Sequence, residues 1–195
     1  RLGLKAFEIG SAYLKRIDIV QAAKPYLEAL AKLVDDTVFM VVENEGQVVY
    51  LYKIIGSSTI VRTCDLGSRN HMYCTGVGKA LLAAYSGDRV ARIVKRHPMR
   101  RLLKNTLTNL GDLLEELRKT RERGYALDDR ENREDTFCVA APLYSVGKEP
   151  IAAISVATFY FKVDGRYFDL LTREVPKTAL EISRKMGFRR ERLYE

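Results

Sequence analysis

The run from Gly124 to Ala157 constrains the fold more than any other stretch, because two apolar segments there follow a short acidic one. Successive side chains of a β-strand point to opposite faces. If both apolar segments are strands, one face of each carries bulky side chains such as Phe137, Val139, Ile154 and Val156. The other face carries only small ones: Cys138, Ala140, Ala153, Ser155 and Ala157.

Two interpretations fit a sheet face made of small side chains. Such a face leaves room for a small molecule and forms one wall of a pocket, or it lets a helix pack closely on the sheet. The pattern of residues does not decide between them.

Other segments predict a mixture of helices and antiparallel strands. Residues 37–43 and 47–55 are rich in branched and aromatic side chains and flank Asn44-Glu45-Gly46, which predicts a hairpin. A shorter strand is expected at 59–64, paired with that hairpin. Apolar spacing predicts the helices listed here: 1–17, 18–33 kinked or divided at Pro25, 76–85, a basic helix at 88–104 capped by Asp88, 110–124, and 168–186 bent at Pro176.

Composition gives only broad limits. The 195 residues carry a formal net charge of +8, which favours anionic partners without selecting one. No apolar run reaches the roughly 18 residues that cross a bilayer, and three cysteines do not suggest a disulfide framework. We therefore expect a cytoplasmic protein without a membrane partner. The first helix has no capping residue before it, which suggests a missing upstream segment.

The sequence around Gly76 is typical of an anion site rather than of a nucleotide hydrolase. A phosphate-binding loop needs Gly five positions before Gly78 and Ser or Thr after Lys79, and the chain has Tyr73 and Ala80 there. What remains is a helix start at which the N–H groups of Gly76 and Val77 could bind a carboxylate.

Other candidate chemistries are weaker. Cys64, His71, Cys74 and Cys138 could be assembled into a metal site, but only His71 and Cys74 have a ligand-like spacing, and a structural role is favoured. The two histidines, His71 and His97, stand in no recognisable catalytic motif. Cys138 has no evident base beside it. A cation site or a pair of catalytic carboxylates could be formed by the acidic residues Asp128, Asp129, Glu131, Glu134 and Asp135. Such a cluster is more typical of a solvated loop, although Asp128 at a strand end could turn inward and accept a ligand hydroxyl.

Three motifs together resemble the effector-binding region of the IclR family of bacterial transcriptional regulators. LGLKAFEIGSAYL resembles the family's linker helix, CTGVGKALLA its pocket loop, and GYALDDRENREDTFCVAAP with IAAISVA its most diagnostic block. The resemblance covers nearly the whole chain. It implies an α+β fold in which helices wrap an antiparallel sheet, similar to GAF and profilin-like domains. It also implies a linker helix at 1–17, an effector-binding and oligomerisation domain at 18–195, and a helix-turn-helix domain upstream.

The resemblance also implies functional residues. Gly76 and Val77 would offer N–H groups to the carboxylate of an organic acid, such as a sugar acid, a 2-keto acid or an aromatic acid. Asp128, Cys138 and Ser155 match lining positions, Thr136 and Ala157 fall where lining residues are common, and Tyr73 would stand near the mouth. No catalytic residue, cofactor or metal is implied. The implied partners are the acid, a second or further copies of the chain as a dimer or tetramer, and operator DNA through the upstream domain.

Some residues depart from the family pattern. Asp135 stands where a glycine is common, so the pocket loop could run differently, although Asp tolerates left-handed geometry. Ala157 replaces a hydroxyl residue. Two rival hypotheses remain open: a GAF-like enzyme that uses Cys138 or Cys74 in redox or acyl chemistry, and a domain that binds nucleic acid through the basic segment 88–104.

Overall fold

The computed structural model describes residues 18–56 and 64–194. The helix predicted at 1–17 and nearly all of the strand predicted at 59–64 lie outside these residues. The predicted hairpin is confirmed as β1 (Thr37–Asn44) and β2 (Gln47–Ile54). Glu45 and Gly46 connect the two strands, and both have positive φ, 57° and 82°. Left-handed geometry at both positions suits the twist of a two-residue hairpin turn.

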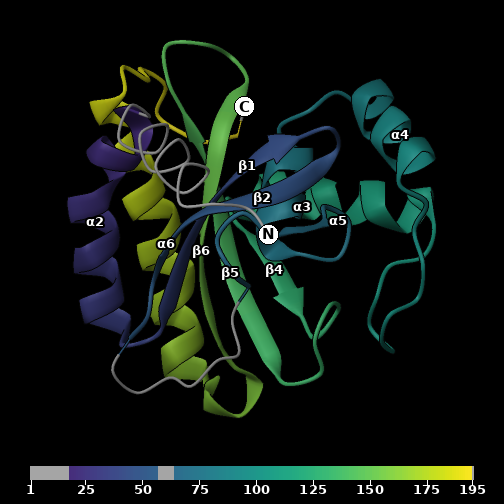
Figure 1. Ribbon diagram of the computed structural model, residues 1–195, viewed down its shortest axis with the longest axis horizontal. Coiled ribbons are helices and arrows are strands. Elements are labelled where there is room, and N and C mark those ends of the chain that lie inside the picture. The colour runs from purple at the N-terminus through teal and green to yellow at the C-terminus, as the bar shows by residue number, and fades with distance from the viewer. Residues whose placement is uncertain (1–17, 57–63, 195) are drawn as a thin grey trace, which may run out of the picture.

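The described strands form one sheet in the order β3-β2-β1-β6-β5-β4, and each neighbouring pair is antiparallel. The remaining strands are β3 (Arg69–His71), β4 (Ala126–Asp129), β5 (Thr136–Tyr144) and β6 (Pro150–Phe159). β1 and β6 occupy the centre (Figure 1). The hairpin is thereby joined to the small-residue strands that follow it by about a hundred residues in the chain.

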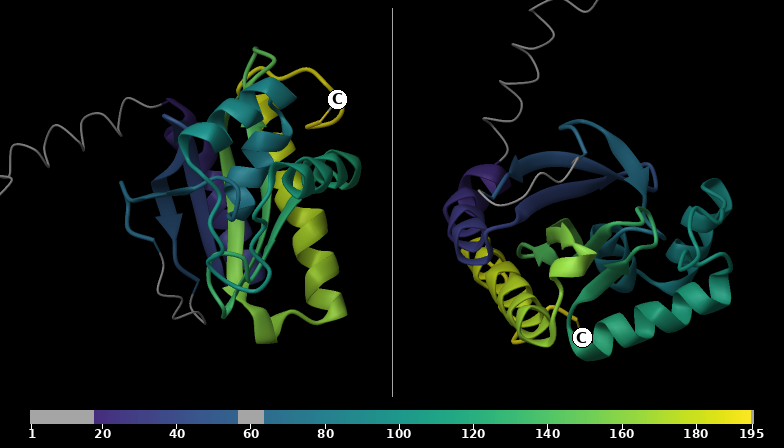
Figure 2. Two further views of the ribbon diagram at one scale, coloured as in Figure 1. Left: turned by 90° about the vertical axis from the view of Figure 1, so that its right-hand side faces the viewer. Right: turned by 90° about the horizontal axis from the view of Figure 1, so that it is seen from below.

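Helices cover both faces of the sheet (Figure 2). The long helices α2 (Asp18–Val34) and α6 (Gly165–Lys185) pack against each other on one face. The other side holds α3 (Gly76–Ala83), α4 (Gly87–Arg96) and α5 (Leu110–Arg123). A 3₁₀ turn, η1 (Tyr160–Lys162), joins β6 to α6. The α+β fold expected from the resemblance is therefore confirmed.

Bulky and small side chains separate to the two faces as the alternation predicts. Cys138 stands opposite Ala157 across β5 and β6, and Ala140 stands opposite Ser155. Phe137, on the bulky face, lies 6.1 Å from Phe168 of α6, measured between ring centroids. A Cβ on Gly76 would lie 3.3 Å from the Cβ atoms of both Ala140 and Cys138, which places α3 on the small face.

Several helix boundaries differ from the prediction. Ser86, not Asp88, caps α4, because its side chain accepts the Arg89 N–H at 3.4 Å. The basic segment is helical only to Arg96, and the residues from 97 to 104 form no helix. Pro25 does not divide α2, and α6 continues through Pro176. The predicted end of α5 is confirmed, because Gly124 has φ 87° and donates to Thr120 O.

Within the described residues, no helix is both long enough and apolar enough to cross a membrane.

Candidate functional site

A cavity lies where α3 begins above the small-residue face. Its interior volume is about 40 Å³, or about 470 Å³ when the solvent at its open mouth is included. The lining residues that the structure describes come from β1, β2, α3, β4, β5, β6 and the loops beside them: Phe39, Tyr50, Cys64, Thr75, Gly76, Val77, Asp128, Asn132, Arg133, Thr136, Cys138, Ser155 and Ala157. Every residue predicted for the site except Tyr73 lines this cavity.

The start of α3 leaves two N–H groups facing the cavity. The first four N–H groups of a helix have no partner within the helix. Thr75 is the N-cap: its hydroxyl oxygen accepts the Gly78 N–H at 3.2 Å and its carbonyl accepts the Lys79 N–H at 2.9 Å. Among the hydrogen bonds of the described residues, none satisfies the N–H of Gly76 or Val77. The positive end of the helix dipole adds to the attraction that these groups exert on an anion.

Both interpretations of the small face apply, to neighbouring parts of it. Gly76 packs on Cys138 and Ala140 so closely that a Cβ would have to push one of them aside. The lining by Ser155 and Ala157 leaves the adjoining part of the face open to the cavity. Small side chains therefore admit the helix to the sheet and also keep space in front of its N-terminus.

Asp128 brings a carboxyl group to the cavity wall. It is only 3% exposed, and its Oδ1 accepts the Glu131 N–H at 2.9 Å. Burial raises the pKa of Asp128 to about 7, with Lys79 opposing and Glu131 reinforcing the increase. The group can therefore be protonated near neutral pH, and it can then donate a hydrogen bond as well as accept one.

A buried ion pair supports the loop that follows Asp128 and strand β4. Lys79 of α3 is 1% exposed and pairs with Glu131. Burial raises the pKa of Glu131 against the effect of Lys79, and one carboxylate oxygen of Glu131 has no partner among the described residues. Thr106 anchors the same residue by donating to its carbonyl at 2.6 Å. The helix α3 thus supplies both the N–H groups at the cavity and the lysine that pairs with Glu131.

Among the remaining predicted lining residues, Thr136, Ser155 and Cys138 contribute uncharged hydroxyl and thiol groups. The Thr136 hydroxyl donates to Asp135 at 3.0 Å, and Ser155 is buried. Burial raises the pKa of the Cys138 thiol well above its usual value, and that of Cys74 to about 12. Both thiols therefore stay neutral at physiological pH, which counts against the cysteine-enzyme hypothesis.

Sequence reasoning missed several lining residues. Phe39 and Tyr50, whose rings meet edge to face at 5.2 Å, come from the hairpin. Phe39 faces the cavity because it stands opposite Ser155 in the β1–β6 pairing. Only that long-range register reveals its orientation. Asn132 and Arg133 were missed because they lie in a segment that was interpreted as a solvated acidic loop.

Tyr73 lies elsewhere. It is buried beside the cavity wall but does not line the cavity, because its hydroxyl donates to Arg100 O and accepts the Arg100 N–H, both at 3.0 Å. Its predicted place at the mouth is therefore corrected: its role is to fix the segment after α4.

The loop between β4 and β5 does not have left-handed geometry at Asp135. Arg130 has the left-handed conformation in this loop, with φ 55°, and Asp135 does not have positive φ. Asp135 instead accepts the Tyr160 N–H through its carbonyl at 2.8 Å and pairs with Arg133 at 3.6 Å. The departure from the family's glycine therefore needs no left-handed residue at 135.

In the part of the chain that the structure describes, no group of three or more His, Cys, Asp or Glu side chains could hold a metal ion.

The protein family described as the C-terminal domain of the bacterial transcriptional regulator IclR matches residues 11–184, which is more than half of this chain. The chain belongs to the IclR family. It is the effector-binding domain of a transcriptional regulator of that family, as the pocket-loop and strand motifs had indicated.

Curated relatives of this IclR-family domain are regulators with a helix-turn-helix. The regulator KdgR of Escherichia coli is 29% identical over 187 residues, which cover 96% of this chain and 71% of KdgR. XynR of the same organism is 30% identical, with 96% of this chain and 75% of XynR covered. The crystal structure of the Thermotoga maritima IclR is similar with a TM-score of 0.90 and 31% identity, covering 95% of this chain and 75% of that one.

Proposed function

We propose that this IclR-family domain senses a small organic acid, whose carboxylate binds the N–H groups of Gly76 and Val77. The observation that carries the proposal is the helix start at the cavity: two N–H groups without a described partner face a space walled by small side chains. A carboxylate there would accept both N–H groups and gain from the helix dipole. The ligand class comprises sugar acids, 2-keto acids and aromatic acids.

The rest of the acid would meet the polar wall formed by Asp128, Ser155 and Thr136. Asp128 can accept from a hydroxyl when ionised and donate to a keto oxygen when protonated, so its raised pKa widens the choice of partner. Ala157 offers no hydrogen bond at the place where it faces the cavity. We expect an acid with one or two polar groups beside its carboxylate and an apolar part against Phe39 and Tyr50.

Binding would regulate transcription through the assembled protein. We propose that the acid binds two arrangements of a dimer or tetramer with different affinity and so changes operator affinity. Coupling of this kind is typically worth about 1–3 kcal/mol. The operator would be bound by a helix-turn-helix domain like those of the curated relatives, with residues 1–17 as the linker, and the regulator would work in the cytoplasm.

A thermal-shift screen of the chain against small acids tests this proposal. An acid that binds raises the unfolding temperature, because it stabilises only the folded state. Each acid is compared with the amide that replaces its carboxylate, and only the acid should stabilise. If no acid stabilises the chain, or if acid and amide stabilise it equally, the proposal fails.

A further inference from the structure

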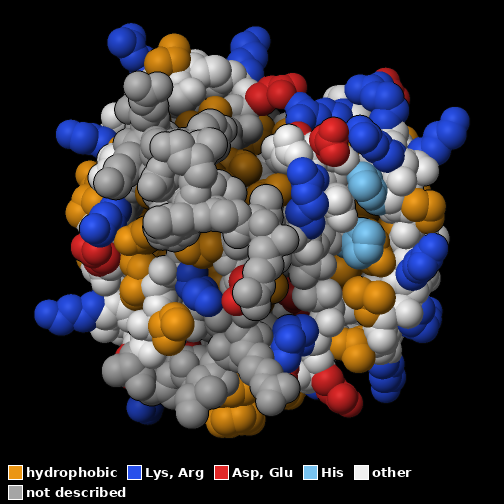
Figure 3. Space-filling model, in the orientation of Figure 1, with side chains coloured by type: hydrophobic (Ala, Val, Ile, Leu, Met, Phe, Trp, Pro, Cys, Tyr) orange, Lys and Arg blue, Asp and Glu red, His pale blue; other side chains and the backbone are white. Residues whose placement is uncertain are grey.

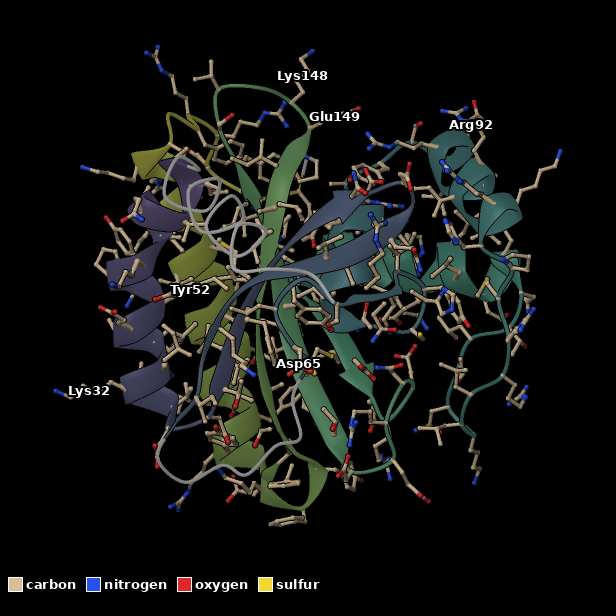
Figure 4. The ribbon with its side chains drawn as sticks, viewed as in Figure 1. Lys32, Tyr52, Asp65, Arg92, Lys148 and Glu149 are labelled. Atoms are coloured by element: carbon tan, nitrogen blue, oxygen red, sulfur yellow. The ribbon has the colours of Figure 1, made fainter. Side chains whose placement is uncertain are left out.

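A second cavity lies at the opposite end of α3. Its interior volume is about 390 Å³, or about 910 Å³ when the solvent at its open mouth is included. Its walls come from four regions far apart in the chain: residues 83–90, α5, the end of β5 with the loop that follows it, and the C-terminal tail. The loop between β5 and β6 carries Lys148 to one rim (Figure 4).

Two buried tyrosines present unused hydroxyl groups to this second cavity. Tyr144 is 3% exposed and Tyr85 is 8% exposed, and both line it. Within the described residues, neither phenol hydroxyl makes a hydrogen bond, although Tyr194 beside them donates to Ala80 O at 3.1 Å. Burial raises the pKa of Tyr85 to about 12 and that of Tyr144 further. Both therefore remain O–H donors. Their hydroxyl oxygens are not among the fully buried polar atoms without a partner, so they reach the solvent in the cavity and are open to a ligand.

The charged side chains of the second cavity are all cations. Arg121, Lys148 and Arg190 line it, and no acidic residue is among its described lining residues. Glu149, the acid next to Lys148, is engaged by Arg89, whose guanidinium also lies 3.6 Å from the centre of the Tyr85 ring. Arg121 and Lys148 therefore meet no acidic side chain among the described lining residues.

The carbonyl end of α3 does not oppose an anion here, because its last carbonyls already accept hydrogen bonds. Leu81 O and Leu82 O accept from the N–H groups of Ala84 and Tyr85 at 3.0 and 3.1 Å. The guanidinium of Arg121 donates to Ala83 O at 3.2 Å, and the Tyr194 hydroxyl donates to Ala80 O. Next along the chain, α4 starts at Gly87 and adds the positive end of a ten-residue helix.

We propose that this second cavity binds a small oxyanion, a phosphate or carboxylate group carried on a compact metabolite. Tyr144 and Tyr85 donate to the oxyanion, and Arg121 and Lys148 neutralise it at the mouth. Val90, Leu114 and Leu117 form an apolar side wall for the body of the ligand. The site is separate from the organic-acid site, since the two cavities share no described lining residue.

Titration calorimetry with inorganic phosphate and with benzoate tests the proposal and separates the two oxyanion sources. It is run at constant ionic strength and in the Ala157→Leu background, which fills the first cavity so that benzoate cannot bind there. Tyr144→Phe and Arg121→Gln should each weaken binding of the preferred anion about tenfold, as expected for the loss of one charge-assisted hydrogen bond. The matched controls Tyr52→Phe and Arg166→Gln, which line neither cavity, should leave it unchanged.

Three results would overturn the proposal: no heat of binding with either anion, equal losses in the controls, or a change of oligomeric mass on Tyr144→Phe with unchanged anion binding. The last result, measured by sedimentation, would show that the cavity is a contact between copies of the chain. A second readout guards against misfolding: in the chain that keeps Ala157, each variant must retain its response to the acid proposed to bind at Gly76.

Discussion

The two ends of α3 meet cavities of opposite construction. At the N-terminus, small side chains of β5 and β6 leave a space lined by two backbone N–H groups and one buried carboxyl group. At the C-terminus, tyrosine rings and arginine and lysine side chains enclose a larger, more open space. The first site uses backbone donors and an acid of raised pKa, so it suits a ligand with both a carboxylate and a further polar group. The second uses side-chain donors and cations, so it suits an oxyanion of simpler shape.

The two cavities also differ in the exposure of the charged side chains that lie at or beside their walls. The first is fixed by the buried Lys79–Glu131 pair. The cations of the second reach solvent at its mouth. Removing one partner of a buried pair leaves an uncompensated charge, whereas removing an exposed cation does not. The two ends of one short helix should therefore respond very differently to the loss of a single charged side chain.

Lys79→Met should have the largest effect. We expect the free energy of unfolding to fall by about 3–5 kcal/mol, because Glu131 loses the partner of its buried charge. Arg121→Met, at the other end of α3, should cost at most about 1 kcal/mol. Urea denaturation measures both. The double variant Lys79→Met/Glu131→Leu should recover most of the loss, and equal costs for the two single lysine and arginine variants would contradict the comparison.

The thiols near the first cavity should react slowly. At pH 8 we expect Cys138 and Cys74 to be alkylated by iodoacetamide at least about a hundredfold more slowly than free cysteine, since burial raises the pKa of both. Mass spectrometry of peptides follows each thiol separately. A bound acid should slow Cys138 further, whereas phosphate should not. Rapid alkylation of Cys138 would favour the cysteine-enzyme hypothesis instead.

Filling the first cavity should separate the two sites. Ala157→Leu places a branched side chain in the space beside Cys138, so we expect acid binding to weaken more than about tenfold, with about 1–3 kcal/mol lost from stability. Phosphate binding at the second cavity should not change. Calorimetry with both ligands on one preparation provides the control, and a parallel loss of both affinities would mean that the cavities are not independent.

The titration of Asp128 in the first cavity should make the stability of the chain depend on pH. Folded Asp128 holds its proton up to a pKa of about 7, whereas in the unfolded chain it loses it near 3.8. The folded state thus binds more protons between these values, and the contribution of Asp128 to stability falls as pH rises from about 4 to 7, by at most about 1.4 kcal/mol per pH unit.

The affinity for the acid should change with pH in the same direction as the stability. An anion near Asp128 favours its protonated form, so affinity should fall by up to about tenfold per pH unit as pH rises through 7. Asp128→Asn should flatten both profiles, while Glu134→Gln, at an exposed position, should leave them unchanged. A wild-type affinity that rises with pH across this range would contradict the protonation assigned to Asp128.

The smallest effect is expected on the basic surface. Arg92, Lys95 and Arg96 of α4 are exposed, and Lys and Arg side chains gather over this helix (Figure 3). We expect the chain to bind generic duplex DNA weakly, with little change on Arg92→Ala. Fluorescence anisotropy over a salt series measures it. A steep decrease of affinity with salt, reduced by Arg92→Ala, would instead support nucleic-acid binding through this segment.

How much could be predicted depends on the range of the interactions involved. The β5–β6 pair, the hairpin, α3 and the cap at Gly124 follow from residues a few positions apart, and the first cavity followed from two such patterns. Phe39 was missed because the side of the sheet to which its ring points depends on the β1–β6 register. Tyr73 was misplaced because a backbone group about 27 residues later holds its hydroxyl. The second cavity joins four distant segments, and no local pattern indicates it.

The most direct test of the acid site is a crystal structure of the chain with the acid that gives the largest thermal shift. The account predicts the carboxylate within hydrogen-bond distance of both Gly76 N and Val77 N, with a polar group of the ligand facing Asp128. An acid seated away from the start of α3, with Gly76 and Val77 N–H groups bound only to water, would contradict it.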